Sequence, residues 1–262
     1  MNRISLRLQN KVALITGASQ GIGAAIAARF ASEGASIVIA DIQLEKGEAT
    51  AAAISNASEA NVIALHCDVA DPTSVDSMHR KAISAFGNID VLVNNAGIAL
   101  FREPLDTTPE DWRRCMSVDL EGAWNCARAV LPGMIAQADG AIINIISNHA
   151  FTVIRKTFPY PVAKHALLGL TRSLGLEYAD RGISVNAISP GYTDTQIAQD
   201  DFDRSPDPAA ARRNVEAKQP PGRLCRPGEV AAIAALLASN EARFMIGENI
   251  VIDGGVSIRM YE

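Results

Sequence analysis

Short hydrophobic runs alternate along this chain with longer stretches whose hydrophobic residues recur at helical spacing. The runs lie at residues 11–16, 35–40, 61–66, 89–93, 141–146, 183–188 and 249–252. Apolar runs of this length are typical of parallel strands covered on both faces. The stretches between them predict helices at 21–33, 45–55, 71–86, 108–136, 160–180 and 227–239, with Pro132 as a candidate break in the fourth. This alternation predicts an α/β fold: a Rossmann-like doubly wound parallel sheet of about seven strands, with helices on both faces.

Residues 196–221 depart from this alternation. The segment is polar, contains four prolines, and has only one extended helical stretch, at 207–218. So long an irregular segment inside a compact domain usually has a function. We predict that it is a lid over the substrate.

The composition limits the class of protein. The chain has 262 residues, of which 48% are hydrophobic and 20% charged, and its net charge is near −5. Its length, without repeats or linkers, predicts a single domain over 1–262. The lack of basic runs argues against a nucleic-acid partner. No apolar run approaches the roughly 20 residues of a membrane span, and residues 1–10 lack the apolar region of a signal peptide. We therefore expect a cytoplasmic protein with no membrane partner.

Four scattered cysteines give no sign of a metal site or a disulfide. They are Cys67, Cys115, Cys126 and Cys225. None forms a C-x-x-C pair, and no histidine stands nearby at ligand spacing. This usage predicts small buried thiols in a reducing compartment and no bound metal.

A glycine-rich turn follows the first predicted strand. Gly17, Gly21 and Gly23 form the pattern G-x-x-x-G-x-G. At a strand-to-helix turn, such glycines allow the backbone to approach a pyrophosphate, and the helix N-terminus offers free N–H groups. A tight turn without a ligand is the alternative interpretation.

Asp41 ends the second predicted strand and decides between these interpretations. A carboxylate there accepts hydrogen bonds from the ribose hydroxyls of NAD and repels the 2′-phosphate of NADP. No arginine or lysine stands in the glycine turn or directly after Asp41 to bind that phosphate. A cap for the next helix is the alternative role of Asp41. We predict that the cofactor is NAD.

Tyr160 and Lys164 are four residues apart and share one face of a predicted helix. An unperturbed phenol has a pKa of about 10, and a neighbouring ammonium lowers it. Such a pair can transfer a proton when an alcohol is oxidised to a carbonyl or a carbonyl is reduced. A half-buried tyrosine beside a solvated lysine is the alternative, and other motifs are needed to decide.

Those motifs occur in an order that resembles the short-chain dehydrogenase/reductase family over the whole chain. The matching pieces are TGASQGIG at 16–23, CDV at 67–69, NNAG at 94–97, Ser147, Tyr160 with Lys164, PG at 190–191, and DGG at 253–255. Ser147 and Tyr160 are thirteen positions apart, which is the spacing that the family uses. The resemblance implies an NAD(P)-dependent oxidoreductase that acts on CH–OH groups.

The resemblance also implies roles for individual residues. Tyr160 would be the general acid/base, Lys164 would hold the nicotinamide ribose and lower the pKa of Tyr160, and Ser147 would bond the substrate oxygen. The candidate cofactor-binding residues are Gly17, Ser19, Gln20, Gly21, Ile22, Gly23, Asp41, Ile42, Asp68, Val69, Asn95, Ala96, Gly97, Tyr160, Lys164, Pro190, Gly191, Tyr192, Thr193 and Thr195. Each cluster follows a predicted strand, so all are expected at the carboxyl edge of the sheet.

Asp119 departs from the family pattern. The family usually reads V-N-L-x-G where this chain has Val118-Asp119-Leu120-Glu121-Gly122. The usual asparagine helps to hold a water that links the catalytic lysine to solvent. Aspartate can accept hydrogen bonds from that water and from Lys164, but it adds a charge and removes a donor. We therefore treat Asp119 as a fourth candidate catalytic residue.

The substrate is less well defined by the sequence. Asn148 and His149 follow Ser147 and, with Ser147 and Tyr160, are the candidate substrate residues. Arg155 and Lys156 are candidates for a carboxylate, with solvated side chains as the alternative. The segments 158–165 and 257–262 resemble family members that act on sugars, polyols or sugar acids.

Three functions stay open on this basis. The first is oxidation or reduction of a sugar, polyol or sugar acid with NAD, between secondary alcohol and ketone or between lactol and lactone. The second is reduction of a 3-oxoacyl thioester, against which Asp41 argues because biosynthetic reductases mostly use NADPH. The third is a nucleotide-binding regulator that has lost catalysis.

The resemblance further implies a homotetramer, in which the helices predicted at 108–136 and 160–180 pack against symmetry mates. Apolar residues on these helices suit such contacts, although each could also face its own core. The candidates are Trp124, Leu167, Leu170 and Leu174.

Overall fold

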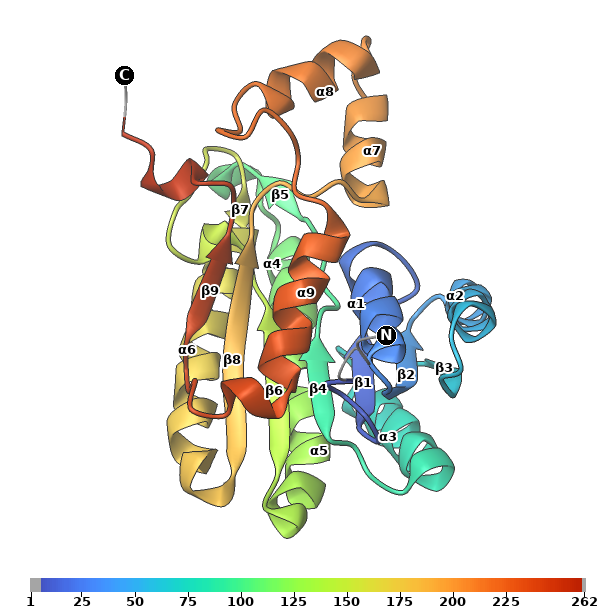
Figure 1. The fold of residues 1–262 in the computed structure, drawn as a ribbon. Coiled ribbons are helices and arrows are strands. Elements are labelled where there is room, and N and C mark those ends of the chain that lie inside the picture. The colour runs from blue at the N-terminus through green and yellow to red at the C-terminus, as the bar shows by residue number, and fades with distance from the viewer. Residues whose placement is uncertain (1–5, 261–262) are drawn as a thin grey trace.

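A seven-stranded parallel sheet forms the centre of the structure, a computed structural model that describes residues 6–260 (Figure 1). Its strand order is β3-β2-β1-β4-β6-β8-β9. The bounds are β1 Val12–Thr16, β2 Ser36–Asp41, β3 Val62–His66, β4 Val91–Asn94, β6 Gly140–Ile145, β8 Ile183–Pro190 and β9 Asn249–Ile252. The predicted α/β fold is confirmed. Residues 1–5 of the N-terminal segment and residues 261–262 of the C-terminal segment lie outside the described part.

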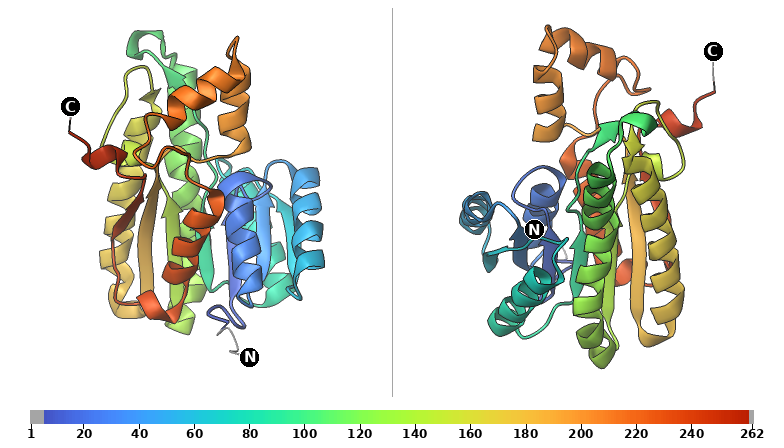
Figure 2. Two further views of the ribbon diagram at one scale, coloured as in Figure 1. Left: turned by 45° about the horizontal axis from the view of Figure 1, so that its top comes forward. Right: turned by 180° about the vertical axis from the view of Figure 1, so that it is seen from behind.

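Helices cover both faces of this sheet (Figure 2). One face carries α1 Gly21–Ser32, α2 Leu44–Ala57 and α9 Pro227–Ala238, and the other carries α3 Pro72–Phe86, α5 Gly122–Gln137 and α6 Tyr160–Tyr178. The strands are apolar because both of their faces are buried: all five residues of β1 and all eight of β8 are buried. Two separate hydrophobic clusters result, one on each side of the sheet.

The predicted helix at 108–136 is divided in the structure. Its first part is α4 Pro109–Met116, and a single π-turn at Ser117–Glu121 separates it from α5. Pro132 lies inside α5 without ending it, so the candidate break at this proline is wrong. Val130, Leu131 and Met134 are buried beside it, and this packing maintains the helix despite the missing N–H donor.

The segment at 196–221 contains two helices rather than one. They are α7 Gln196–Asp203 and α8 Pro208–Glu216, and both lie beyond the carboxyl ends of the strands (Figure 1). The helix expected at 207–218 corresponds to α8, whereas α7 was not predicted. Ala198 and Phe202 of α7 form a small apolar cluster with Leu224, and Ala211 and Val215 of α8 pack against it, which holds the two helices together.

A second, two-stranded sheet was also not predicted. It pairs β5 Phe101–Arg102 with β7 Phe158–Pro159 in antiparallel fashion. Two-residue strands have no detectable periodicity, so no hydrophobic pattern predicts them. The pairing places Phe101 beside the start of α6, where Tyr160 lies.

The candidate interface residues differ in exposure. Leu167 and Leu174 are buried and Leu170 is partly buried against the chain's own core, whereas Trp124 is 40% exposed on α5. The alternative of facing the core is therefore correct for the three leucines, and Trp124 is still available for a subunit contact. Within residues 6–260, no helix is both long enough and apolar enough to cross a membrane.

Candidate active site

The candidate residues gather at one edge of the sheet. The glycine turn follows β1, the NNAG segment ends β4, Ser147 follows β6, and the PG segment ends β8. Because these strands are parallel, their carboxyl ends meet at the same edge, below α7 and α8 in Figure 1. This is the edge at which doubly wound folds bind ligands.

The glycine turn has a geometry that other residues would disturb. Gly17 and Gly21 have φ values of 60° and 61°, in the left-handed region. A Cβ on Gly23 would lie 2.5 Å from the carbonyl oxygen of Gly17 and 2.6 Å from Asn95 Nδ2. Glycine is therefore required at Gly23 by close packing, and the turn can approach a ligand closely.

The first turn of α1 and the end of β2 carry polar groups suited to a dinucleotide. The N-cap residue Gln20 makes no side-chain cap, so the first N–H groups of α1 are available to a pyrophosphate. Ser19 Oγ is buried and has no hydrogen-bond partner among the described residues. Asp41 is 7% exposed and accepts hydrogen bonds from the N–H groups of Ser19 and Gln43, each at 2.9 Å. These groups fit the phosphate and ribose of a nucleotide.

Asn95 braces the glycine turn through its side chain. Its Nδ2 donates to the carbonyl oxygens of Thr16 at 3.0 Å and Gly17 at 2.8 Å. The backbone N–H groups of Asn95 and Ala96 donate to Thr16 Oγ1, each at 3.0 Å. Asn95 therefore joins β1 to β4 and fixes the shape of the turn.

Three further candidate positions lie after β2 and β3. The Asp68 carboxylate accepts the N–H of Ala70 at 3.0 Å, and Val69 is buried with its carbonyl bonded by Asn125 Nδ2 at 3.0 Å. Ile42 is 59% exposed beside Asp41. An exposed isoleucine at the strand edge supplies an apolar surface suited to a flat aromatic base.

The residues that follow β8 face the lid as well as the sheet. Gly191 N–H donates to the carbonyl of Ile252 at 3.1 Å, and Thr193 Oγ1 donates to the carbonyl of Gly191 at 3.1 Å. Thr195 caps α7 by accepting the N–H of Ala198 at 3.4 Å. The Tyr192 side chain packs on Phe202 and donates to Asp201 Oδ2 at 3.2 Å, so it is directed toward α7.

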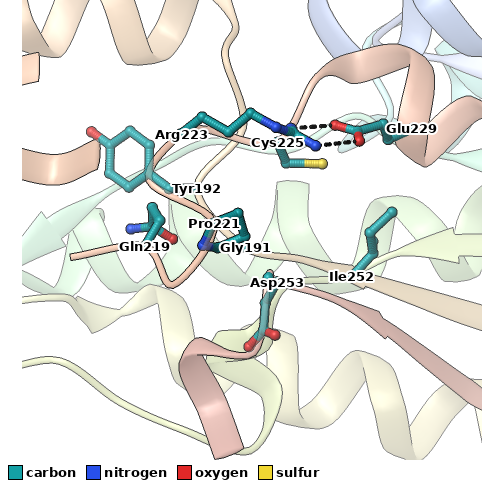
Figure 3. Close-up of a pocket in the computed structure, with 10 residues that line it drawn as sticks. Gly191, Tyr192, Gln219, Pro221, Arg223, Cys225, Glu229, Ile252 and Asp253 are labelled. Atoms are coloured by element: carbon teal, nitrogen blue, oxygen red, sulfur yellow. Dashed lines mark hydrogen bonds and ion pairs between the residues drawn. The ribbon is translucent and has the colours of Figure 1, made fainter. Parts of the chain in front are cut away.

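A small cavity lies between the end of β8, the turn that follows β9, and residues 219–229 (Figure 3). Its volume is about 100 Å³, and Gly191, Gln219, Cys225 and Asp253 are among its lining residues. Arg223 and Glu229 form a two-fold ion pair at its rim, with distances of 2.8 and 2.7 Å. Burial raises the pKa of Asp253, but the N–H groups of Ser257 and Gly255, which donate to its carboxylate at 2.9 Å each, more than offset this, so the pKa is lowered.

Ser147 follows β6 by two residues and lies near Tyr160. Its hydroxyl accepts the N–H of His149 at 3.2 Å, so it caps a short turn, and it donates to Asn148 Oδ1 at 3.4 Å. Burial raises the pKa of Tyr160 most, and Ser147 acts to lower it.

Tyr160 is the first residue of α6, and Lys164 lies one turn later. Lys164 is 4% exposed, and its Nζ lies 5.3 Å from the centre of the Tyr160 ring. The alternative of a solvated lysine is therefore wrong. The structure brings the two residues together.

Asp119 contacts Lys164 directly. The π-turn directs its carboxylate into the site, where Oδ1 lies 3.2 Å from Lys164 Nζ, and its side chain has no exposed area. Burial raises the pKa of the Asp119 carboxyl, and Lys164 acts to lower it. At 3.2 Å, no water fits between the two groups.

The pKa of Tyr160 lies above its ordinary value in this arrangement, contrary to the net lowering expected from Lys164. Burial raises it most, and Asp119 adds to the increase, whereas Lys164 and Ser147 lower it. Burial lowers the pKa of Lys164, but Asp119 and Tyr160 more than offset this, so the pKa of Lys164 is also raised. Lys164 lowers the pKa of Tyr160 as expected, but burial and Asp119 raise it by more.

An aromatic wall beside Tyr160 was missed by the sequence. The ring of Phe101 packs edge-on against Tyr160, with centres 5.4 Å apart, and lies 6.4 Å from the ring of His149. Burial lowers the pKa of His149, which keeps its imidazole neutral. His149 thus lies at the candidate site. No motif includes Phe101, which reaches the site only through the β5–β7 pairing.

Lys156 lies at the surface and pairs with Glu103 at 3.0 Å, both side chains being more than half exposed. Arg155 is exposed as well. The solvated alternative is therefore correct for these two residues. Within residues 6–260, no three His, Cys, Asp or Glu side chains are grouped as a metal site would require.

Comparison with known proteins identifies the family. A family model described as "Enoyl-(Acyl carrier protein) reductase" matches residues 17–257. The chain is 40% identical to the cis-4-hydroxycyclohexanecarboxylate dehydrogenase of Sinomonas cyclohexanicum over 94% of this chain and 96% of that protein. The chain is a short-chain dehydrogenase/reductase.

Other family members agree in sequence and in fold. The D-threitol dehydrogenase of Mycolicibacterium smegmatis is 36% identical to this chain, and the match spans 97% of this chain and 95% of that protein. The crystal structure of levodione reductase superposes with a TM-score of 0.93 at 32% identity, over 97% of this chain and all of that one. The family uses nicotinamide cofactors. This short-chain dehydrogenase/reductase is an oxidoreductase that acts on CH–OH groups.

Proposed function

We propose that this chain uses NAD to interconvert a secondary alcohol and a ketone, or a lactol and a lactone, on a sugar, polyol or sugar acid. The observation that carries the proposal is the position of Tyr160. Its ring centre lies 5.3 Å from Nζ of the buried Lys164, and Ser147 is near its hydroxyl, at the sheet edge that also holds the glycine turn. A proton-transferring group is thereby fixed beside a nucleotide site.

In this mechanism Ser147 and Tyr160 bind the oxygen of the substrate. During oxidation, the alcohol O–H gives its proton to the phenolate oxygen of Tyr160, and Ser147 donates to the developing carbonyl oxygen. During reduction, the Tyr160 hydroxyl returns the proton. The bound nicotinamide supplies or receives the hydride at carbon. Lys164 holds a positive charge beside Tyr160 and so favours the phenolate.

The cofactor preference rests on Asp41. Its buried carboxylate stands at the end of β2, beside the unpartnered Ser19 Oγ. A negative charge there accepts hydrogen bonds from ribose hydroxyls and repels a 2′-phosphate. The first turn of α1 and the exposed Ile42 complete a site for the adenosine half.

The substrate class rests on the names of two relatives and on the residues that follow Ser147. The names of two relatives contain a polyol, threitol, and a hydroxy acid, hydroxycyclohexanecarboxylate. Asn148 and the neutral His149 lie next to Ser147 and suit a substrate with further hydroxyl groups. The proposal also includes a homotetramer in the cytoplasm, with the half-exposed Trp124 of α5 at a subunit contact.

Two other functions are distinguishable by experiment. A 3-oxoacyl-thioester reductase would share with the enoyl reductases that name the matching family only an acyl-thioester substrate, and Asp41 disfavours the NADPH that such reductases mostly use. A regulator without catalysis would bind NADH and turn over nothing.

The test is a panel of sugars, polyols, sugar acids and 3-oxoacyl thioesters, assayed with NAD(H) and NADP(H) by absorbance at 340 nm. Turnover of a polyhydroxy alcohol with NAD supports the proposal. Turnover of the thioester with NADPH, or NADH binding with no turnover of any alcohol or ketone, contradicts it.

A further inference from the structure

The carboxylate of Asp119 is enclosed by donors from three parts of the chain. Ile98 directs its backbone N–H toward both oxygens, at 3.2 and 3.4 Å, and Lys164 Nζ lies 3.2 Å from Oδ1. Cys115 Sγ lies 3.8 Å from Oδ2, and burial raises the pKa of this thiol to about 12, so it keeps its proton and can donate. Burial raises the pKa of the Asp119 carboxyl, and these three donors act against burial to favour the ionised form that pairs with Lys164.

Two local features produce the direct contact with Lys164. The π-turn at Ser117–Glu121 adds a residue to one helical turn and directs Asp119 inward. Gly97 leaves the space that the carboxylate fills, because a Cβ there would lie 2.6 Å from Asp119 Oδ1 and 3.4 Å from Lys164 Nζ. The ion pair is therefore a built part of the site.

This pairing changes the electrostatics at Tyr160. The groups that face the phenol are Lys164 from α6, Asp119 from the π-turn, Cys115 from α4, and Ser147 and His149 after β6. Of these, Cys115 and His149 are neutral, so Lys164 and Asp119 carry the charges. The carboxylate compensates much of the ammonium charge that would otherwise stabilise a phenolate.

We propose that Asp119 is a positioning residue that holds Lys164 and, through its negative charge, moves the working range of Tyr160 to more alkaline pH than a neutral amide at this position would give. Alcohol oxidation requires the phenolate, so its rate rises with pH as Tyr160 loses its proton. Carbonyl reduction requires the phenol and declines over the same range. The inference rests on the proposed function only in giving Tyr160 the proton-transfer role.

The test is the pH dependence of kcat/KM for alcohol oxidation in Asp119→Asn. Removal of a charge near the phenol is expected to move the rising limb to lower pH by about one unit. Glu121→Gln removes the same charge from the exposed end of the same π-turn and is expected to leave the limb unmoved. If Asp119→Asn does not fold, Asp119→Ser is the second neutral variant.

A readout without substrate separates this inference from the proposed function. The tyrosinate absorbance near 295 nm is titrated in the wild type, in Asp119→Asn and in Tyr160→Phe, and the component absent from Tyr160→Phe belongs to Tyr160. Its midpoint is expected to fall in Asp119→Asn. The inference is overturned if Asp119→Asn moves neither the tyrosinate midpoint nor the rising limb of kcat/KM, or if Glu121→Gln moves them equally. Either result overturns it even if Tyr160→Phe abolishes turnover. Turnover that survives Tyr160→Phe instead overturns the proposed function.

Discussion

Arg212 on α8 and Asp194 in the segment after β8 form a two-fold ion pair, with Nη1–Oδ1 at 3.1 Å and Nη2–Oδ2 at 2.7 Å. Asp194 lies between Thr193 and Thr195, which are candidate cofactor residues. The pair therefore connects α8 directly to the edge of the candidate nucleotide site. Arg212 also bonds Glu216 on its own helix at 2.9 Å, which fixes the guanidinium plane.

Replacing Arg212 by lysine is expected to weaken substrate binding. Lysine keeps the charge but cannot make the two parallel hydrogen bonds. Because both side chains are more than a third exposed, solvent screening limits the effect, and we expect KM for the substrate to rise roughly two- to fivefold with kcat nearly unchanged. Steady-state kinetics check this. Arg204→Lys, which alters an exposed pair with Asp201 at 3.8 Å, is the control, and an equal rise in that variant would count against a special role for Arg212.

Replacing Asp41 by serine is expected to reverse the cofactor preference. The change removes the charge that repels a 2′-phosphate and one of the acceptors for ribose hydroxyls. Loss of hydrogen bonds to a charged group predicts that the ratio of kcat/KM for NAD to that for NADP falls about tenfold to a hundredfold. Glu45→Gln, at an exposed position in the first turn of α2, is the matched charge control. A ratio that stays constant in Asp41→Ser shows that Asp41 does not select the cofactor.

Replacing Gly23 by alanine is expected to impair nucleotide binding. The added methyl group would lie 2.5 Å from the carbonyl oxygen of Gly17, so the turn must shift. Overpacking of this kind costs about 1–3 kcal/mol, and we expect the Kd for NADH to rise at least about tenfold. Fluorescence titration of NADH gives the Kd. Gly228→Ala introduces the same group where no atom lies within 4 Å, and its Kd is expected to match the wild type. Equal Kd values in both variants would contradict the role of the turn.

Much of the fold follows from the sequence because burial imposes a visible pattern. The strands of the central sheet are apolar on both faces, and Asp71 marks the start of α3 by accepting the Thr73 N–H at 2.9 Å. Helix α7 was missed because it is short and polar, and its Thr195 cap resembles an ordinary loop residue. The π-turn was missed because it alters hydrogen bonding without altering the hydrophobic spacing.

The candidate site was predictable in part. Helical spacing places Tyr160 and Lys164 on one face, and the resemblance to the family implies that Ser147 joins them. Phe101 was not predictable, because its position depends on a pairing between two strands far apart in the chain. The net rise in the pKa of Tyr160 was also not predictable, since it depends on burial and on the 3.2 Å contact between Lys164 and Asp119.

The most direct test of the proposed chemistry is kcat for the substrate found in the panel, measured in Tyr160→Phe. Removal of this hydroxyl deletes the proton-transferring group, and we expect kcat to fall roughly 10²- to 10⁴-fold while NADH still binds. Tyr178→Phe removes the same hydroxyl from the far end of α6 and is expected to keep kcat near the wild-type value. If Tyr160→Phe turns over the substrate at the wild-type rate, Tyr160 does not transfer the proton.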